Sequence, residues 1–374
     1  MKLALAIFAM FPDGGLQRDF ATIARRLADA GHEVHAVATS WEGPRPDGVA
    51  VHLLPVRGRS NHGRMAGFGR ALADWRAAHR PDALTGFNRL PGLDIHYCGD
   101  VSFIEQAGDR GPLYRMTPRY RTYAALECAV FAPASGTEIL ALSQRTADGY
   151  RKLHGTPEAR FHLLPPGIDP SRKRPKDAAA RGKIFRSGLG IPPGAPLVLA
   201  IGARMDTKGV DRTLEAVAAM AAGGGPQAHL LVLGRGDIAT IHKRAVRLGL
   251  YGRVYLPGPR SDVLDALCAA DALAHPARRE NTGGAILEAI VAGLPVVATA
   301  NCGFAEHIAR ADAGVVLDEP FDQMAFASAL ARALRGPDHT RWSAAGVIYG
   351  RTEDLYSGLD TAALKIAELA EARR

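Results

Sequence analysis

Two glutamates with seven residues between them frame a glycine turn in the second half of the chain. They are Glu280 and Glu288, and the segment that joins them reads Asn281-Thr282-Gly283-Gly284-Ala285-Ile286-Leu287. We expect Glu280 in a loop and Glu288 two turns into the following helix, on the same face. A carboxylate can accept two hydrogen bonds from vicinal hydroxyl groups, as a ribose or a pyranose presents them, and the glycines leave the next N–H groups open to phosphate. The segment therefore predicts a site for a sugar that carries phosphate.

Two basic residues, Arg204 and Lys208, lie in another loop that follows an expected strand and precedes a helix beginning near Asp211. They would emerge at the carboxyl end of that strand, where a diphosphate can be clamped. Lysine and arginine are also commonly exposed without a ligand, so an ordinary surface role stays open for both.

A further glycine turn, Gly14-Gly15, lies between the first expected strand and an amphipathic helix. Glycines at this place allow backbone N–H groups to approach an anion at the helix N-terminus. The same two residues also fit a tight strand-to-helix turn with no ligand.

The elements that position these residues are short apolar runs, which alternate with helical patterns along almost the whole chain. This alternation is typical of parallel sheets covered by helices on both faces, and it predicts an α/β fold. In the first half we expect strands at residues 3–8, 33–39, 51–56, 83–87, 95–99 and 139–143. In the second half we expect them at residues 197–202, 229–233, 254–256, 272–275, 295–299 and 315–317.

The length of 374 residues favours two domains, because single cores stop growing at roughly 250 to 300 residues. Residues 165–183 are rich in proline and charge and lack a periodic apolar face, so we interpret them as an interdomain hinge. The predicted boundary lies near Gly167, between an N-terminal domain of residues 1–166 and a C-terminal domain of residues 167–349. Two doubly wound, Rossmann-like domains would face each other across a central cleft and collect ligand groups at the carboxyl ends of their strands.

The composition limits which chemical classes of partner and which cellular compartment fit the protein. A formal charge of +8 favours an acidic partner, which could be nucleic acid, an anionic membrane or a phosphorylated substrate. The four cysteines lie far apart without a CxxC pattern, which speaks against a disulfide framework or a zinc site and fits a reducing cytosol. The apolar start of the chain lacks a small-residue cleavage site, so we expect a buried strand there. No apolar run reaches the roughly 20 residues that span a bilayer.

With these motifs the chain resembles the retaining glycosyltransferases of the GT-B fold, whose hallmark is a pair of glutamates spaced as Glu280 and Glu288 are. The resemblance implies that Glu280 contacts the donor sugar, that Glu288 binds the ribose, and that Arg204 and Lys208 hold the diphosphate. The family more often spaces this basic pair one residue further apart. The remaining donor-binding residues expected on this basis are Gly14, Gly15, Thr282, Gly283, Gly284, Ala285 and Ile286.

Within that family the chain is similar to the glucosyltransferases that add the first outer-core hexose to the inner-core heptose of lipopolysaccharide. The segments that carry the likeness are FPDGGLQRDF, SWEG, NHGR, GFNRLPGLD, LYRMTPRYRTYAALE, LLPPGID, KGVDR, AILEAIVAGLPV and DLYS. The likeness implies a UDP-hexose donor, glucose above all, and an inner-core lipopolysaccharide acceptor. Because Asn281 and Thr282 replace the small residues usual at their positions, the identity of the hexose stays open.

The same likeness nominates further site residues. Asp100 is implied as the acidic group near the reacting centre, and we count it as catalytic together with Glu280 and Lys208. Asp19 is implied as an acceptor contact and Arg172 as a further diphosphate contact. From their own surroundings, Asp100 could equally be a helix N-cap and Arg172 a solvated linker charge. A C-terminal helix over about residues 350–374 is implied to pack back on the first domain.

The chain contains no Asp-x-Asp, the usual means of bringing a divalent ion to a nucleotide diphosphate. We therefore expect no metal and no other cofactor. Arg204, Lys208 and helix N-termini would stabilise the leaving diphosphate instead. Retention of configuration, which the resemblance implies, suggests front-face attack in which the departing phosphate oxygen takes the acceptor proton.

Tyrosine and arginine alternate in the segment that runs from Leu113 to Phe131. The pattern predicts a helix at the headgroup level of an anionic membrane, each basic residue contributing on the order of 1 kcal/mol. An ordinary amphipathic surface helix also fits, whereas the stacking aromatics of a nucleic-acid binder are not evident. We expect a cytoplasmic protein, peripheral on the inner membrane and without a nucleic-acid partner, whose contact residues are Tyr114, Arg115, Arg119, Tyr120, Arg121 and Tyr123.

Two other functions stay open at this point. A UDP-N-acetylhexosamine 2-epimerase of the same fold would convert its nucleotide sugar without an acceptor. A non-catalytic, membrane-associated scaffold would keep the fold alone, although Glu280, Lys208 and Glu288 together favour an enzyme.

Overall fold

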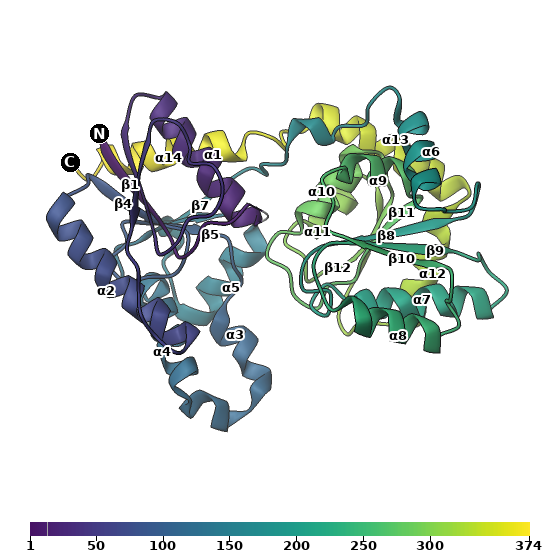
Figure 1. The fold of residues 1–374 in the computed structure, drawn as a ribbon, viewed down its shortest axis with the longest axis horizontal. Coiled ribbons are helices and arrows are strands. Elements are labelled where there is room, and N and C mark those ends of the chain that lie inside the picture. Colours follow the sequence, from purple (N-terminus) through teal and green to yellow (C-terminus); the bar gives the residue numbers. More distant parts are fainter. Residues whose placement is uncertain (13) are drawn as a thin grey trace. The chain divides into compact units, whose positions relative to one another are not determined.

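A computed structural model describes residues 1–12 and 14–374 and divides them into two units (Figure 1). The first unit joins Met1–Gly167 to Tyr356–Arg374, and the second is Ile168–Leu355. The division falls beside the expected boundary at Gly167. The chain returns to the first unit at Tyr356, after helix α13 (Pro337–Thr352) has ended, and therefore later than residue 350.

The first unit is built on a parallel sheet of seven strands in the order β3-β2-β1-β4-β5-β6-β7. The order runs outward from β1 in both directions, which is the doubly wound arrangement. The strands are β1 (Lys2–Ile7), β2 (Glu33–Ala38), β3 (Val49–Leu53), β4 (Ala83–Gly86), β5 (Ile95–Cys98), β6 (Glu138–Ala141) and β7 (Phe161–Leu163).

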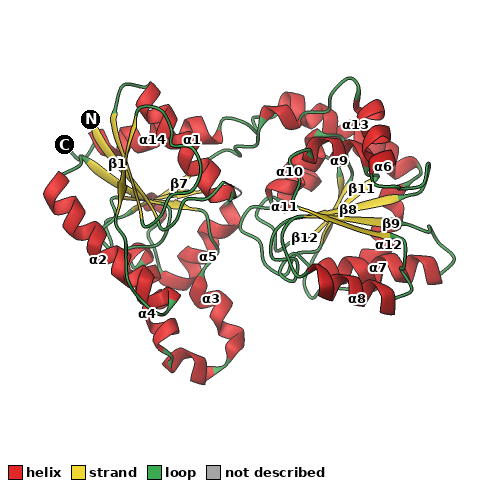
Figure 2. Cartoon of the chain, in the orientation of Figure 1, coloured by secondary structure: helices red, strands yellow, loops and turns green. Residues whose placement is uncertain are grey.

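Helices cover both faces of this sheet (Figure 2). They are α1 (Gly15–Asp29), α2 (Asn61–His79), α3 (Phe103–Ala107), α4 (Pro118–Phe131), α5 (Gln144–His154) and α14 (Gly358–Glu371). Successive side chains of a strand point to opposite faces, so β1 contributes to two cores. Leu3, Leu5 and Ile7 pack with α1 and α14, and Ala4 and Ala6 pack with α2 and α4.

The second unit holds a parallel sheet of six strands in the order β10-β9-β8-β11-β12-β13. The strands are β8 (Leu197–Ile201), β9 (His229–Leu233), β10 (Val254–Gly258), β11 (Ala272–His275), β12 (Val296–Thr299) and β13 (Gly314–Leu317). Besides α13, its helices are α6 (Ala178–Gly188), α7 (Val210–Ala222), α8 (Ile238–Arg247), α9 (Val263–Ala269), α10 (Gly284–Val291), α11 (Ala305–Arg310) and α12 (Gln323–Leu334).

Two doubly wound, parallel α/β domains are thus confirmed, and every expected strand is present, with shifts of a few residues at the ends. The sequence did not predict β7. It also assigned residues 178–183 to the interdomain hinge because they lack a periodic apolar face, whereas they form the start of α6. Gly182 lets this helix approach α9 so closely that a Cβ at its position would overlap the backbone of Cys268.

Candidate functional site

Two of the predicted catalytic residues meet in the second unit. Lys208 lies in the turn between β8 and α7, Glu280 lies in the loop between β11 and α10, and their side chains form an ion pair. Only 23% of the Lys208 side chain and 13% of the Glu280 side chain are exposed. Burial, with a smaller contribution from the charge of Arg204, lowers the pKa of Lys208 to about 8. The result is a poorly hydrated cation, which can meet an anion at little further desolvation cost.

A histidine that the sequence did not nominate holds the other side of Glu280. His275 is the last residue of β11, is buried, and places Nε2 3.3 Å from Oε2 of Glu280. Burial, together with the charge of Lys208, lowers the pKa of His275 to about 3. The ring is therefore neutral near pH 7 and can donate Nε2–H to the carboxylate. Its position at a strand end, five residues before Glu280, is the signal that could have identified it.

Gly283 ends the loop and starts α10. It has a φ of 83°, in the left-handed region that favours glycine, and no side chain caps the first turn of the helix. Gly284 and Ala285 are half-buried and are the first two residues of α10, so their N–H groups lie at the N-terminus of the helix. Ile286 differs from the prediction, because its side chain lies in the core and its N–H donates to the Gly283 carbonyl at 2.8 Å. The half-buried Thr282 accepts a hydrogen bond at its carbonyl from the backbone N–H of Phe304, 2.8 Å away.

Glu288 lies one turn into α10, not two, because the helix begins at Gly284. Its Oε1 is 3.6 Å from Nε of Arg172, and both side chains are more than four-fifths buried. Arg172 ends a short 3-10 helix, Pro170–Arg172, so it is anchored against α10 and is not a free linker charge.

Arg204 is exposed and adopts a left-handed backbone with a φ of 57°. Its carbonyl accepts the N–H groups of Thr207 and Lys208 at 2.9 and 3.1 Å. The turn that carries the predicted basic pair is thereby closed by its own backbone.

In the first unit, Gly14 is the N-cap of α1 and Gly15 is its first residue. Asp19 follows one turn later and accepts a hydrogen bond from the Tyr97 hydroxyl at 3.0 Å. Burial raises the pKa of Asp19 above its usual value, against the opposing effects of Tyr97 and Arg18. A carboxyl group in such surroundings suits a polar contact with a ligand hydroxyl.

Asp100 lies just beyond β5, with an exposed side chain. It is not a helix N-cap, because Ser102 caps α3 and accepts from the N–H of Glu105 at 3.1 Å. The structure therefore leaves the carboxylate of Asp100 exposed at the carboxyl end of a parallel strand.

The tyrosine and arginine segment is not one helix. Pro112–Met116 form a 3-10 helix, Thr117 caps the next element, and α4 starts at Pro118. Leu113 and Met116 are 79% and 64% exposed, and the arginines at 115, 119 and 121 are exposed beside half-buried tyrosines at 114, 120 and 123. Two apolar side chains and three cations thus share the same exposed segment.

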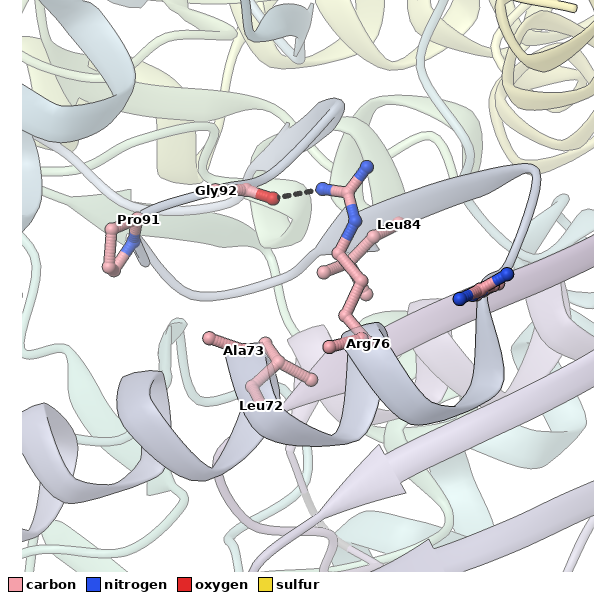
Figure 3. A pocket seen from close by; sticks show the side chains of 8 residues that line it. Leu72, Ala73, Arg76, Leu84, Pro91 and Gly92 are labelled. Carbon is pink, nitrogen blue, oxygen red and sulfur yellow. Dashed lines mark hydrogen bonds between the residues drawn. The ribbon is translucent and has the colours of Figure 1, made fainter.

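A cavity of about 390 Å³ lies elsewhere in the first unit, beside α2 (Figure 3). Arg76 extends from the helix to the carbonyl of Gly92 and to Asp94, and none of the predicted site residues lines the cavity. Its lining residues are Leu72, Ala73, Arg76, Ala77, Arg80, Leu84, Pro91 and Gly92.

Among residues 1–12 and 14–374, no three histidine, cysteine, aspartate or glutamate side chains are grouped so that they could hold a metal ion. In the same part of the chain, no helix combines the length and the apolar character that a membrane span requires.

Two family models match the sequence. Residues 183–346 match the model described as "Glycosyl transferases group 1", and residues 13–172 match "Glycosyltransferase Family 4". The lipopolysaccharide glucosyltransferase WaaG of Escherichia coli K12 is 38% identical over 359 residues, which cover 96% of each chain. The lipopolysaccharide core biosynthesis glycosyltransferase LpsE of Rhizobium meliloti is 26% identical over 317 residues, or 82% of each chain.

Solved structures agree with the sequence matches. The crystal structure of WaaG has a TM-score of 0.90 at 37% identity and covers 97% of this chain and 99% of its own. Anabaena HepE, solved in complex with UDP and glucose, has a TM-score of 0.75 at 18% identity over 100% of both chains, which shows a shared fold. With a relative 38% identical over nearly the whole chain, the protein belongs to the group 1 glycosyl transferases of the GT-B fold and is a glycosyltransferase of the family that includes WaaG.

Proposed function

We propose that this glycosyltransferase moves glucose from UDP-glucose to the inner-core heptose of lipopolysaccharide. The identity to a lipopolysaccharide glucosyltransferase over 96% of the chain supports the reaction class. The structural observation that carries the proposal is the buried ion pair of Lys208 and Glu280. Glu280 also contacts the neutral His275 and lies four residues before the first residue of α10.

The donor is bound by the second unit in this proposal. Lys208, Arg204 and Arg172 neutralise the diphosphate together with the N–H groups at the start of α10. When the diphosphate replaces Glu280 as the partner of Lys208, Glu280 can accept hydrogen bonds from hydroxyl groups of the sugar. Glu288 accepts hydrogen bonds from the ribose hydroxyls, and Arg172, whose Nε lies 3.6 Å from its Oε1, holds the carboxylate in place.

The acceptor is bound by the first unit, where Asp19 holds a hydroxyl group and Asp100 is the acidic group that takes part in the reaction. The acceptor oxygen forms a bond to the anomeric carbon while the bond from that carbon to the phosphate oxygen breaks. The phosphate oxygen takes the acceptor proton on the same face, so configuration is retained. Fixed cations stabilise the departing diphosphate, and we propose that no metal is required.

We also propose that the protein is cytoplasmic and peripheral on the inner membrane. The exposed Leu113 and Met116 would enter the headgroup region, and Arg115, Arg119 and Arg121 would face anionic lipid.

The direct test incubates the protein with inner-core lipopolysaccharide that lacks its outer hexoses, with a panel of UDP-hexoses, and with or without EDTA. The mass of the lipid product is read. A gain of one hexose, largest with UDP-glucose and unchanged by EDTA, is expected. No gain from any donor despite measurable UDP binding would reject the transfer proposal, and conversion of UDP-N-acetylhexosamine alone would replace it with an epimerase.

The role of Glu288 has a matched control, because Glu306 is an exposed glutamate on α11 of the same unit. Glu288→Ala should weaken UDP binding about 10- to 100-fold, since a charge-assisted hydrogen bond contributes roughly 1.5 to 3 kcal/mol. Glu306→Ala should leave binding unchanged. Calorimetry with UDP measures both, and equal affinities would remove Glu288 from the ribose site.

A further inference from the structure

The loop that carries Asp100 is held by its backbone. The Tyr150 hydroxyl donates to the Asp100 carbonyl at 3.1 Å, and Nη1 of Arg89 donates to the carbonyl of Val101 at 3.0 Å. Tyr150 belongs to α5, and Arg89 belongs to the connection between β4 and β5. Two separate elements therefore fix consecutive peptide groups of one short loop.

A buried carboxylate completes the arrangement from a third element. Glu127 of α4 is fully buried and accepts hydrogen bonds at 2.6 Å from both the Ser102 hydroxyl and the Phe103 N–H. Nη1 of Arg89 is 2.9 Å from Oε2 of Glu127 and 2.9 Å from the Tyr150 hydroxyl. Nε2 of His154 is 3.0 Å from Oε1 of Glu127. Every residue from Asp100 to Phe103 thus receives or gives a bond within this network.

The network is charged. Burial alone would raise the pKa of Glu127, but the bonds from His154 and Ser102 and the charge of Arg89 bring the pKa below its usual value. Replacing a buried ion pair by apolar side chains of the same volume is often neutral or stabilising. Stability alone therefore does not account for an ion pair buried under this loop, whereas a fixed loop geometry does.

We propose that Arg89, Glu127 and Tyr150 are positioning residues for Asp100, which hold the backbone of residues 100–103 so that its exposed carboxylate keeps one place at the end of β5. The proposal rests on the proposed function for the role of Asp100 in the reaction. None of the three side chains is assigned a contact with donor or acceptor; they act through the loop.

Tyr150 allows a gentle test, because its ring and its hydroxyl do different things. The ring stacks on Phe131 with centroids 3.7 Å apart and planes 5° apart, which anchors α5. Tyr150→Phe keeps that stack and removes only the hydroxyl. Tyr349→Phe in the second unit is the matched control, because this hydroxyl is also buried and bonds one partner, Nδ1 of His307, at 2.7 Å.

Three quantities are measured for the wild type and both variants, together with the melting temperature as a check on folding: kcat for hexose transfer, UDP affinity, and hydrogen exchange of a peptide spanning residues 99–106. Tyr150→Phe should lower kcat about tenfold and raise exchange in this peptide, with UDP affinity within twofold and melting temperature almost unchanged. Tyr349→Phe should change none of the three. Glu127→Gln should show the same pattern more strongly if it folds.

Unchanged exchange at residues 99–106 in Tyr150→Phe would overturn the proposal. So would a kcat within twofold of the wild type, or a loss of kcat that only follows a loss of UDP binding and melting temperature, since that is a structural role. If the wild type transfers no hexose, the proposed function fails, and loop exchange alone then decides the positioning proposal in either direction.

Discussion

At the scale of single residues, Lys208 of the second unit can change its charge close to physiological pH. Lys208 has a pKa lowered to about 8 by burial, and we propose that its ammonium form binds the diphosphate. A group of this pKa loses its proton in the free protein as the pH rises above 8, so UDP binding should weaken above pH 8 by up to about tenfold per pH unit.

The control for this prediction is Lys208→Arg, because a guanidinium stays protonated throughout that range. UDP affinity is measured between pH 7 and 9.5 for both proteins. The titration of UDP itself affects both curves equally, so their difference isolates Lys208. A wild-type curve parallel to that of Lys208→Arg would show that Lys208 does not titrate in the binding range.

Local motifs predict that Lys208 and Glu280 lie in loops at strand ends, one in a basic pair after a strand and the other before a glycine turn, but their direct contact was not predicted. The bond from His275 to Glu280 was not predicted either, because a histidine at the end of an apolar strand is more often an ordinary core residue, and only its spacing to Glu280 sets it apart. The network around Glu127 was also not predicted from the sequence, since the bonded partners of Glu127 lie 24 to 38 residues from it along the chain and meet it only through tertiary packing.

At the scale of elements, the 3-10 helix at Pro112–Met116 and α4 present the predicted membrane contact. Arg119→Gln with Arg121→Gln should weaken binding to vesicles containing anionic lipid about 10- to 30-fold, since each basic residue contributes on the order of 1 kcal/mol near such a surface. Arg247→Gln with Arg351→Gln removes the same charge from exposed positions of the second unit and should have little effect. Cosedimentation measures both, and equal losses would mean that only net charge matters.

Most elements could be predicted because strands buried on both faces read as continuous apolar runs. The exceptions have physical causes. Strand β7 has three residues, none fully buried, and lies at the edge of its sheet. Helix α6 buries Ala178, Gly182 and Phe185, so its apolar stripe is made largely of small side chains. Pro118 favours the start of a helix, so the segment from Leu113 to Phe131, which its composition suggested to be one helix, is divided there.

At the scale of the whole molecule, local patterns predict the doubly wound fold of both halves, whereas the return of the chain to the first unit was expected only from the resemblance to the family, and the structure shows it at Tyr356. Tyr356 follows α13 without a proline or glycine cluster to mark the change of unit. Helix α14 then packs on α1 through Ala362 and Ile366, residues that would also suit a helix of the second unit. The apolar face of an amphipathic helix shows that it packs on another surface, but the local sequence pattern does not show which unit provides that surface.

Both units bury neutral histidines, and this sets how stability depends on pH. Burial, in each case aided by a nearby arginine or lysine, lowers the pKa of His96, His275 and His307 to about 3, 3 and 4. An unfolded histidine titrates near 6.5, so below that pH the unfolded chain binds protons that the folded chain does not. The free energy of unfolding should therefore fall as pH drops below about 6.5, by about 1.4 kcal/mol per pH unit for each fully buried histidine.

His307 is the residue on which to test this, because it is outside the proposed site and only its Nδ1 bond to the Tyr349 hydroxyl must be replaced. Urea unfolding at pH 7.5, 6.0 and 5.0 should show a steep loss of stability in the wild type. His307→Gln should be less stable at pH 7.5 but lose about 1.4 kcal/mol less per pH unit below 6.5. Carboxylates with lowered pKa values titrate mostly below this window, so they cannot supply the difference. Equal slopes in the two proteins would mean that His307 is protonated in the folded state.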